Sequence, residues 1–167
     1  MELKIIGGCI IVVCGFLFGN YYAGRLKKRC AMLQSFISAV VRLQNTIAFT
    51  AAPVQELYEK LAQESGDAGE FFARLCASKW LQKAPEKAWN KTLLECTALL
   101  KEDKEILRQM GQMLGGSDCD SQINQLALCR TQLEQQLDSA RSVASSNMKL
   151  ARGLGVFGGI FVVLVLL

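Results

Sequence analysis

The residue types that usually perform catalysis are sparse in this chain. It contains no histidine, so the commonest general base and the commonest nitrogen ligand for metals are both missing. Its seven cysteines are scattered, their count is odd, and none forms a C-x-x-C motif. Reduced and mostly buried thiols are therefore the expectation, although a four-cysteine site built from distant helices is left open. We predict no catalytic residue, no cofactor and no metal site.

Two short motifs look like ligand-binding loops but do not match them. Leu114-Gly-Gly-Ser117 lacks the Gly-Lys-Ser/Thr that completes a phosphate-binding loop, and its residues suit a helix end. Asp118-Cys-Asp120 resembles the start of a calcium loop. The sixth position of that loop would be Ile123 instead of glycine, and the twelfth would be Cys129 instead of glutamate. Neither motif predicts a ligand.

A charged run at Lys101, Glu102, Asp103, Lys104 and Glu105 can be interpreted in two ways. In the simpler interpretation it is the solvated first turn of a helix, where acidic side chains favour the helix dipole. Alternatively, it is a charged docking patch for a partner protein. The candidate docking residues are then Lys101, Glu102, Asp103 and Glu105.

Two tryptophans, Trp80 and Trp89, lie on neighbouring predicted helices. We predict that both are core anchors, which is commoner than a cofactor box. The sequence does not distinguish this role from that of a pocket for a partner.

The central part of the chain is predicted to be all-α, because no segment alternates as a strand does. From Leu26 to Ile47 apolar residues recur every three or four positions, and they do so again from Leu126 to Met148. Pro53 and Pro85 suit the first turns of helices, whereas Ser65-Gly66 and Gly115–Asp118 suit breaks. We expect a bundle of about six helices, in which the fourth buries Trp89, Leu93 and Leu94.

The two ends of the chain are predicted to be transmembrane helices. Neither Ile5–Gly19 nor Gly153–Leu167 contains a charged residue. The first is long enough if Leu3–Gly24 is counted, but the second spans only about 22 Å and could instead lie on the membrane. We predict an anchor at 1–24, a cytosolic helical domain at 25–152 and a second anchor at 153–167. Each anchor carries a glycine pair that could pack helices, Gly15 with Gly19 and Gly155 with Gly159.

The orientation of these anchors follows from the basic residues beside them. The basic flanking residues are Arg25, Lys27, Lys28 and Arg29 after the first segment, and Lys149 and Arg152 before the second. Both groups face the central domain, which the positive-inside rule therefore places in the cytosol. Between Cys30 and Asn147 there are 12 Lys and Arg against 14 Asp and Glu. The domain has no basic excess, so we predict no nucleic-acid partner.

Four blocks of residues carry a resemblance to a known family. They are Leu43-Gln-Asn-Thr-Ile-Ala-Phe-Thr-Ala-Ala-Pro53, Leu100-Lys-Glu-Asp103, Met110-Gly-Gln-Met-Leu-Gly-Gly-Ser-Asp118 with Gln122, and Leu154-Gly-Val-Phe-Gly-Gly159. The chain resembles the stage III sporulation protein AB family along its whole length, and Gly111, Gly115 and Asp118 fall where the family places them. It departs at Gln44, Asn45 and Thr46, where relatives usually have Glu-Thr-Glu, and at Ala52-Pro53-Val54, where they have Thr-Pro-Leu. A contact that those acids make would be weakened or replaced here.

The resemblance implies a non-enzymatic component of the channel that joins mother cell and forespore during sporulation. The family's soluble domain is similar to that of platform proteins in type II secretion and type IV pilus systems, which engage a cytosolic ATPase. The implied partners are such an ATPase, other membrane subunits of the same complex and the bilayer of the mother-cell membrane around the forespore. A homo-oligomer is left open. The alternatives are a membrane-tethered adaptor unrelated to sporulation and a small membrane-bound enzyme.

Overall fold

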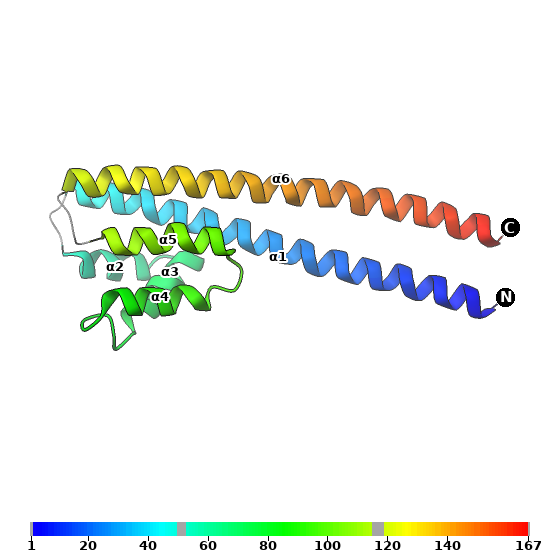
Figure 1. Cartoon of the computed structure of the whole chain (residues 1–167), viewed down its shortest axis with the longest axis horizontal. Helices are drawn as coiled ribbons and strands as arrows, with labels where there is room; N and C mark the ends of the chain where they lie inside the picture. Colours follow the sequence, from blue (N-terminus) through cyan, green and yellow to red (C-terminus); the bar gives the residue numbers. More distant parts are fainter. Residues whose placement is uncertain (1, 50–52, 115–118, 167) are drawn as a thin grey trace. The chain divides into compact units, whose positions relative to one another are not determined.

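The chain folds into six helices and no strand over the residues that its computed structural model describes, which are 2–49, 53–114 and 119–166 for the backbone and 21–49, 53–114 and 119–146 for side chains. The helices are α1 (Glu2–Phe49), α2 (Val54–Ala62), α3 (Asp67–Cys76), α4 (Pro85–Glu95), α5 (Lys101–Met113) and α6 (Cys119–Leu166) (Figure 1). The all-α prediction is confirmed. Pro53 directly precedes α2 and Pro85 is the first residue of α4, as their fixed φ angles favour.

Contacts divide the chain into two compact units, and α1 and α6 contribute to both. One unit comprises Met1–Lys28 with Ser139–Leu167, and the other comprises Arg29–Asp138. Among the residues whose side chains are described, no helix contains a stretch long and apolar enough to cross a membrane. The predicted anchor residues up to 20 and from 153 onward lie outside those side chains, and so do Gly15, Gly19, Lys149, Arg152, Gly155 and Gly159.

Within the second unit, α1 and α6 run antiparallel. The Gln44 side chain donates a hydrogen bond to the Ile123 carbonyl (3.2 Å), and Arg29 donates one to the Gln136 side chain (3.0 Å). The residue numbers of the contacting partners increase along α1 as they decrease along α6. Each helix buries residues at three- and four-residue steps, the spacing that keeps side chains on one face. These are Leu33, Phe36, Val40 and Leu43 on α1, and Leu126, Cys129, Leu133 and Leu137 on α6.

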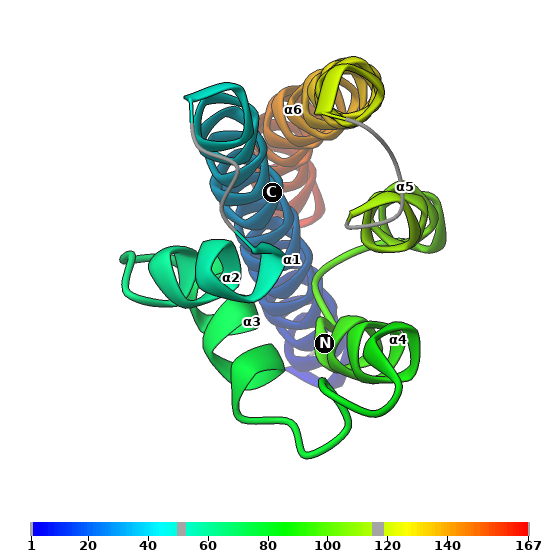
Figure 2. The same cartoon turned by 90° about the vertical axis from the view of Figure 1, so that its left-hand side faces the viewer.

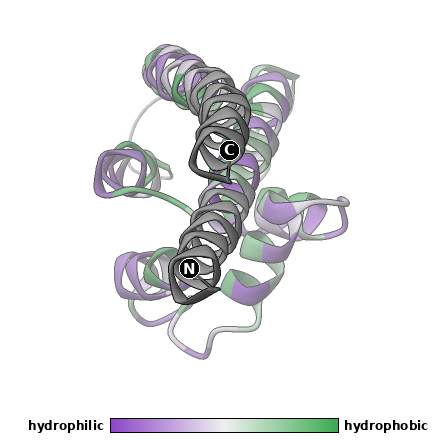
Figure 3. Cartoon of the chain, turned by 90° about the vertical axis from the view of Figure 1, so that its right-hand side faces the viewer, coloured by the Kyte–Doolittle hydropathy of each residue, from purple (hydrophilic) through white to green (hydrophobic). Residues whose placement is uncertain are grey.

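The remaining four helices complete this unit. α2 and α3 lie to the left and α4 and α5 to the right in Figure 2. Figure 3 shows hydrophilic and hydrophobic residues on each of these helices, the pattern of amphipathic helices around a shared core.

An aromatic cluster holds the second unit together. Phe71 and Phe72 of α3 meet Trp89 of α4 at ring-centre distances of 5.0 and 6.0 Å. Phe36 of α1 lies edge-on to Phe71 at 5.3 Å, and Tyr58 of α2 stacks on Phe72 at 5.6 Å. Such pairs add stability beyond the apolar area that they bury. Four helices are therefore joined through one group of rings.

The prediction of a buried side chain is confirmed for Trp89 and is wrong for Trp80 and Leu94. Trp89 is 3% exposed, whereas Trp80 is 53% exposed, because Trp80 lies in the loop between α3 and α4. Leu94 is also exposed, since the inward face of α4 is filled by Ala88, Trp89, Thr92 and Leu93. On α4, helical spacing therefore identified the buried face only to within one residue, since Leu93 is buried and Leu94 is not.

The turn between α2 and α3 requires two glycines. Gly66 has a φ of 115°, a conformation that residues with a Cβ rarely adopt. A Cβ on Gly69 would collide with the carbonyl oxygen of Glu64. The turn contacts α1 through Ser35, whose hydroxyl accepts a hydrogen bond from the Ala68 amide (3.0 Å). These residues fix where α3, and hence the aromatic cluster, meets α1.

Candidate functional site

The outward side of α5 carries most of the candidate docking residues. Lys101, Glu102 and Glu105 are exposed at its beginning. The opposite side of the helix is buried through Asp103, Leu107 and Met110, which follow one another at steps of four and three residues. The charged side is therefore directed to solvent because the apolar stripe is directed to the core. We call Lys101, Glu102, Glu105, Arg108 and Gln109 the α5 face.

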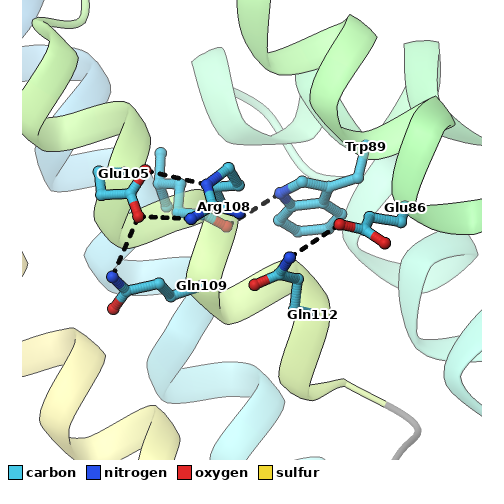
Figure 4. A network of polar contacts seen from close by, with 7 residues as sticks. Glu86, Trp89, Glu105, Arg108, Gln109 and Gln112 are labelled. Atoms are coloured by element: carbon cyan, nitrogen blue, oxygen red, sulfur yellow. Dashed lines mark hydrogen bonds and ion pairs between the residues drawn. The ribbon is translucent and has the colours of Figure 1, made fainter.

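Polar contacts fix the geometry of the α5 face (Figure 4). Both carboxylate oxygens of Glu105 accept hydrogen bonds from Arg108, at 2.6 and 2.9 Å, and one also accepts from Gln109 at 3.2 Å. The hydrogen bonds from Arg108 lower the pKa of Glu105 to about 2. Further along, Gln112 donates to Glu86 of α4 at 2.7 Å. The carboxylate of Glu105 is ionised at neutral pH and contacts neighbours three and four residues further along α5.

Asp103 does not belong to this face, so the prediction of a solvated docking role is wrong for it. Its side chain is fully buried and forms a bidentate ion pair with Arg29 of α1, with both nitrogen–oxygen distances at 2.8 Å. The same carboxylate accepts a hydrogen bond from the Leu100 amide at 2.9 Å, which satisfies a donor at the start of α5. Asp103 ties the beginning of α5 to α1.

Arg29, predicted as one of the four basic residues that flank the first segment, is also buried. It is 7% exposed, and besides Asp103 it contacts Gln136 of α6. The hydrogen bond to Asp103 raises the pKa of Arg29, although burial acts in the opposite sense. Arg25, Lys27 and Lys28 are exposed, as expected. Only the last member of the basic cluster turns into the core.

A signal for this ion pair was present in the sequence. Arg29 lies in the same helical phase as Leu33, Phe36 and Val40, and Asp103 lies in phase with Leu107 and Met110. A charged residue on each of two apolar stripes indicates that the two charges are paired, because an unpaired buried charge is very costly. This signal was overlooked because Arg29 and Asp103 each belong to a run of charged residues that looks exposed as a whole.

Trp89 joins α4 to α5 from below the α5 face. Its indole nitrogen donates a hydrogen bond to the Leu107 carbonyl at 2.9 Å. The ring lies so close to α5 that a Cβ added at Gly111 would come within 2.5 Å of it. Gly111, one of the positions that carry the family resemblance, is therefore a site of close helix packing. Gly115 and Asp118 lie outside the described residues.

Substituting Gly111 with alanine is expected to destabilise the protein. Alanine normally stabilises a helix by about 1 kcal/mol relative to glycine. Here the extra methyl group must displace the Trp89 ring, and overpacking of this kind costs about 1–3 kcal/mol. Chemical denaturation followed by circular dichroism measures the difference. The matched control is Gly24→Ala, because a Cβ at Gly24 meets no atom within 4 Å; equal stability of both variants would contradict the packing role.

The cysteines and the remaining surface groove offer no arrangement of side chains for catalysis within the described residues. Of the described cysteines, Cys96 and Cys129 are buried and Cys119 is exposed, and burial raises the pKa of Cys129 to about 12. Within the described side chains, no three Cys, Asp or Glu residues are grouped as metal ligands. A groove of about 400 Å³ lies between α1 and the α2–α3 turn. Its lining includes Ser35, Ser38 and the Arg42–Glu64 ion pair.

Comparison with known proteins identifies the family. Residues 4–167 match the family model for stage III sporulation protein AB. The chain is also 29% identical over 178 residues to the stage III sporulation protein AB of Bacillus subtilis (strain 168), an alignment that covers 99% of both chains. No solved structure matches. The match extends from the first predicted anchor through the α5 face to the last helix, so the chain belongs to the stage III sporulation protein AB family and has a role in sporulation.

Proposed function

We propose that this protein is a non-enzymatic, membrane-anchored platform in a sporulation channel, and that its α5 face docks a cytosolic ATPase. The observation that carries the proposal is that α5 presents exposed charges while its buried side is tied to α1 and α4. Arg29 and Asp103 fix the start of the helix to α1, and Trp89 fixes its middle to α4. Preorganised charged side chains favour specific and fast association with a partner of complementary charge.

In this proposal the segments 1–24 and 153–167 cross the mother-cell membrane around the forespore, and residues 25–152 lie in the cytosol. The exposed Arg25, Lys27 and Lys28 support this arrangement, because basic side chains beside a membrane helix favour the cytosolic side and anionic headgroups. The two glycine pairs would pack the anchors against each other or against other membrane subunits.

Reversing the exposed charges at the start of α5 is expected to weaken ATPase docking strongly while the protein stays folded. The variant Lys101→Glu with Glu102→Lys changes two exposed residues and leaves Asp103 and Glu105 in place. Loss of a docking contact of this kind weakens binding by at least about tenfold, or 1.4 kcal/mol. The measurement is co-purification of the sporulation ATPase with the full chain from membranes.

The matched control reverses an exposed ion pair on α6, Arg130→Glu with Glu134→Arg, which keeps both charges four residues apart. The control should retain the ATPase. If both variants retain the ATPase equally, the docking site does not lie at the start of α5. If the unmodified protein retains no ATPase, the proposal of ATPase docking is wrong.

A further inference from the structure

Trp80 is an aromatic residue presented to solvent by an ordered loop. It is 53% exposed, although a tryptophan offers a large apolar surface. The Trp80 carbonyl accepts hydrogen bonds from the Lys83 and Ala84 amides at 3.1 and 2.7 Å, and the Ser78 carbonyl accepts one from Leu81 at 3.1 Å. The backbone of the loop between α3 and α4 is thus closed by its own hydrogen bonds, and this loop exposes Trp80.

Four lysines lie near Trp80 in the sequence. Lys79 and Lys83 lie in the same loop, and Lys87 and Lys91 follow on α4 at four-residue steps. All four are exposed, and none forms an ion pair within the part of the chain that the structure describes. We call Lys79, Trp80, Lys83 and Lys87 the Trp80 surface. Tryptophan is among the residues most enriched at the anchors of protein-binding surfaces, whose rims are polar.

The same chain carries a surface of opposite charge. Between residues 54 and 70 there are five acidic residues and one lysine, so α2 and the first half of α3 are strongly acidic. Glu56, Glu59 and Glu70 are exposed there, and Glu64 is half-buried. Glu56 pairs with Lys60 and Glu64 pairs with Arg42, whereas Glu59 and Glu70 form no ion pair within the described residues. We call these four glutamates the acidic face. Between residues 71 and 94, in contrast, five basic residues oppose a single acid, Glu86.

We propose that the Trp80 surface of one copy binds the acidic face of a second copy of this chain. Opposite charges of similar size on two segments of one protein make copies attractive to each other without any other partner. Because the two surfaces differ, the contact is head-to-tail and extends into a ring or a row of subunits. Anchoring in one membrane would raise the local concentration and favour such assembly. This contact does not depend on ATPase docking, which uses the α5 face.

Sedimentation of the full chain in a neutral detergent tests the proposal. Self-association should weaken at least tenfold between an ionic strength of about 0.1 M, where the Debye length is about 10 Å, and about 1 M, where it is about 3 Å. Association through the membrane helices alone would not respond to salt in this way. Trp80 fluorescence should shift to shorter wavelength on association, as the ring leaves water.

Charge reversal provides the decisive variants. Lys79→Glu with Lys83→Glu, and separately Glu59→Lys with Glu70→Lys, should each abolish self-association, and circular dichroism should show both to be folded. In a mixture of the two variants, the Trp80 surface made acidic in the first can bind the acidic face made basic in the second. Association between the two variants should therefore return. Trp80→Ala should weaken association of the otherwise unmodified chain by at least about tenfold, or 1.4 kcal/mol.

Several outcomes would overturn the proposal. One is association of either charge-reversed variant as tightly as the unmodified chain, and another is failure of the mixture to associate. A monomeric unmodified chain that binds phosphatidylglycerol vesicles through Trp80 would assign this surface to lipid instead. Loss of ATPase co-purification on Lys79→Glu, without any change in self-association, would assign it to the ATPase.

Discussion

Replacement of Asp103 by alanine is expected to lower the free energy of unfolding by about 3–5 kcal/mol. The substitution leaves the Arg29 guanidinium buried without its counter-charge, and it removes the acceptor of the Leu100 amide at the start of α5. Chemical denaturation of the full chain, followed by circular dichroism, measures the loss. This is a large fraction of the stability of an ordinary domain.

Two controls separate this effect from a general loss of charge on α5. Glu102→Ala removes an exposed acid one residue away and should change stability by no more than about 0.5 kcal/mol. Replacing both members of the pair with leucine should recover much of the loss, because no unpaired charge then remains. A small effect of Asp103→Ala would mean that water or another group reaches Arg29.

Trp89→Ala is expected to cost about 3–5 kcal/mol, the usual loss when a large aromatic side chain is removed from a core. Trp89 contacts Phe71, Phe72 and Tyr58, with ring centres 5.0 to 6.0 Å away, and it donates a hydrogen bond to the Leu107 carbonyl. The variant would therefore loosen α3, α4 and α5 together. Thermal and chemical denaturation should both show the change.

The chain provides its own matched control in its second tryptophan. Trp80 is exposed, so Trp80→Ala should alter stability by no more than about 0.5 kcal/mol while it weakens the proposed self-association. Trp89→Phe keeps the aromatic body and loses the indole donor, which should cost about 1 kcal/mol. Equal effects of Trp80→Ala and Trp89→Ala on stability would contradict the assignment of one to the surface and the other to the core.

These two predictions bear on the α5 face although neither residue belongs to it. Asp103 and Trp89 approach α5 from its buried side, one at its start and the other near Leu107 and Gly111. Partial destabilisation of either contact should weaken ATPase docking without changing any exposed charge. Docking that survives loss of both contacts would indicate that the charges on α5 need no preorganisation.

The candidate site could be predicted only in part because helical phase and charge clustering gave conflicting indications. The run from Lys101 to Glu105 looks uniformly solvated, yet α5 buries its third residue, Asp103, and exposes Lys101, Glu102 and Glu105. The basic cluster that ends with Arg29 likewise looks uniform. Each cluster contains one residue whose partner is distant in sequence, and only the pair explains why either charge is buried.

The all-α fold and the six helices of the described residues follow from local features of the sequence. Apolar periodicity, Pro53 and Pro85 at helix starts, and Ser65-Gly66 at a turn act within a few residues, and each of these elements is found where it was predicted. The tertiary structure alone decided which residues meet. Arg29 and Asp103 pair across 74 positions of the chain, and Trp89 packs into the space that Gly111 leaves. Helical phase indicates that Arg29 and Asp103 are each turned to the core, but that these two meet each other depends on how distant helices pack.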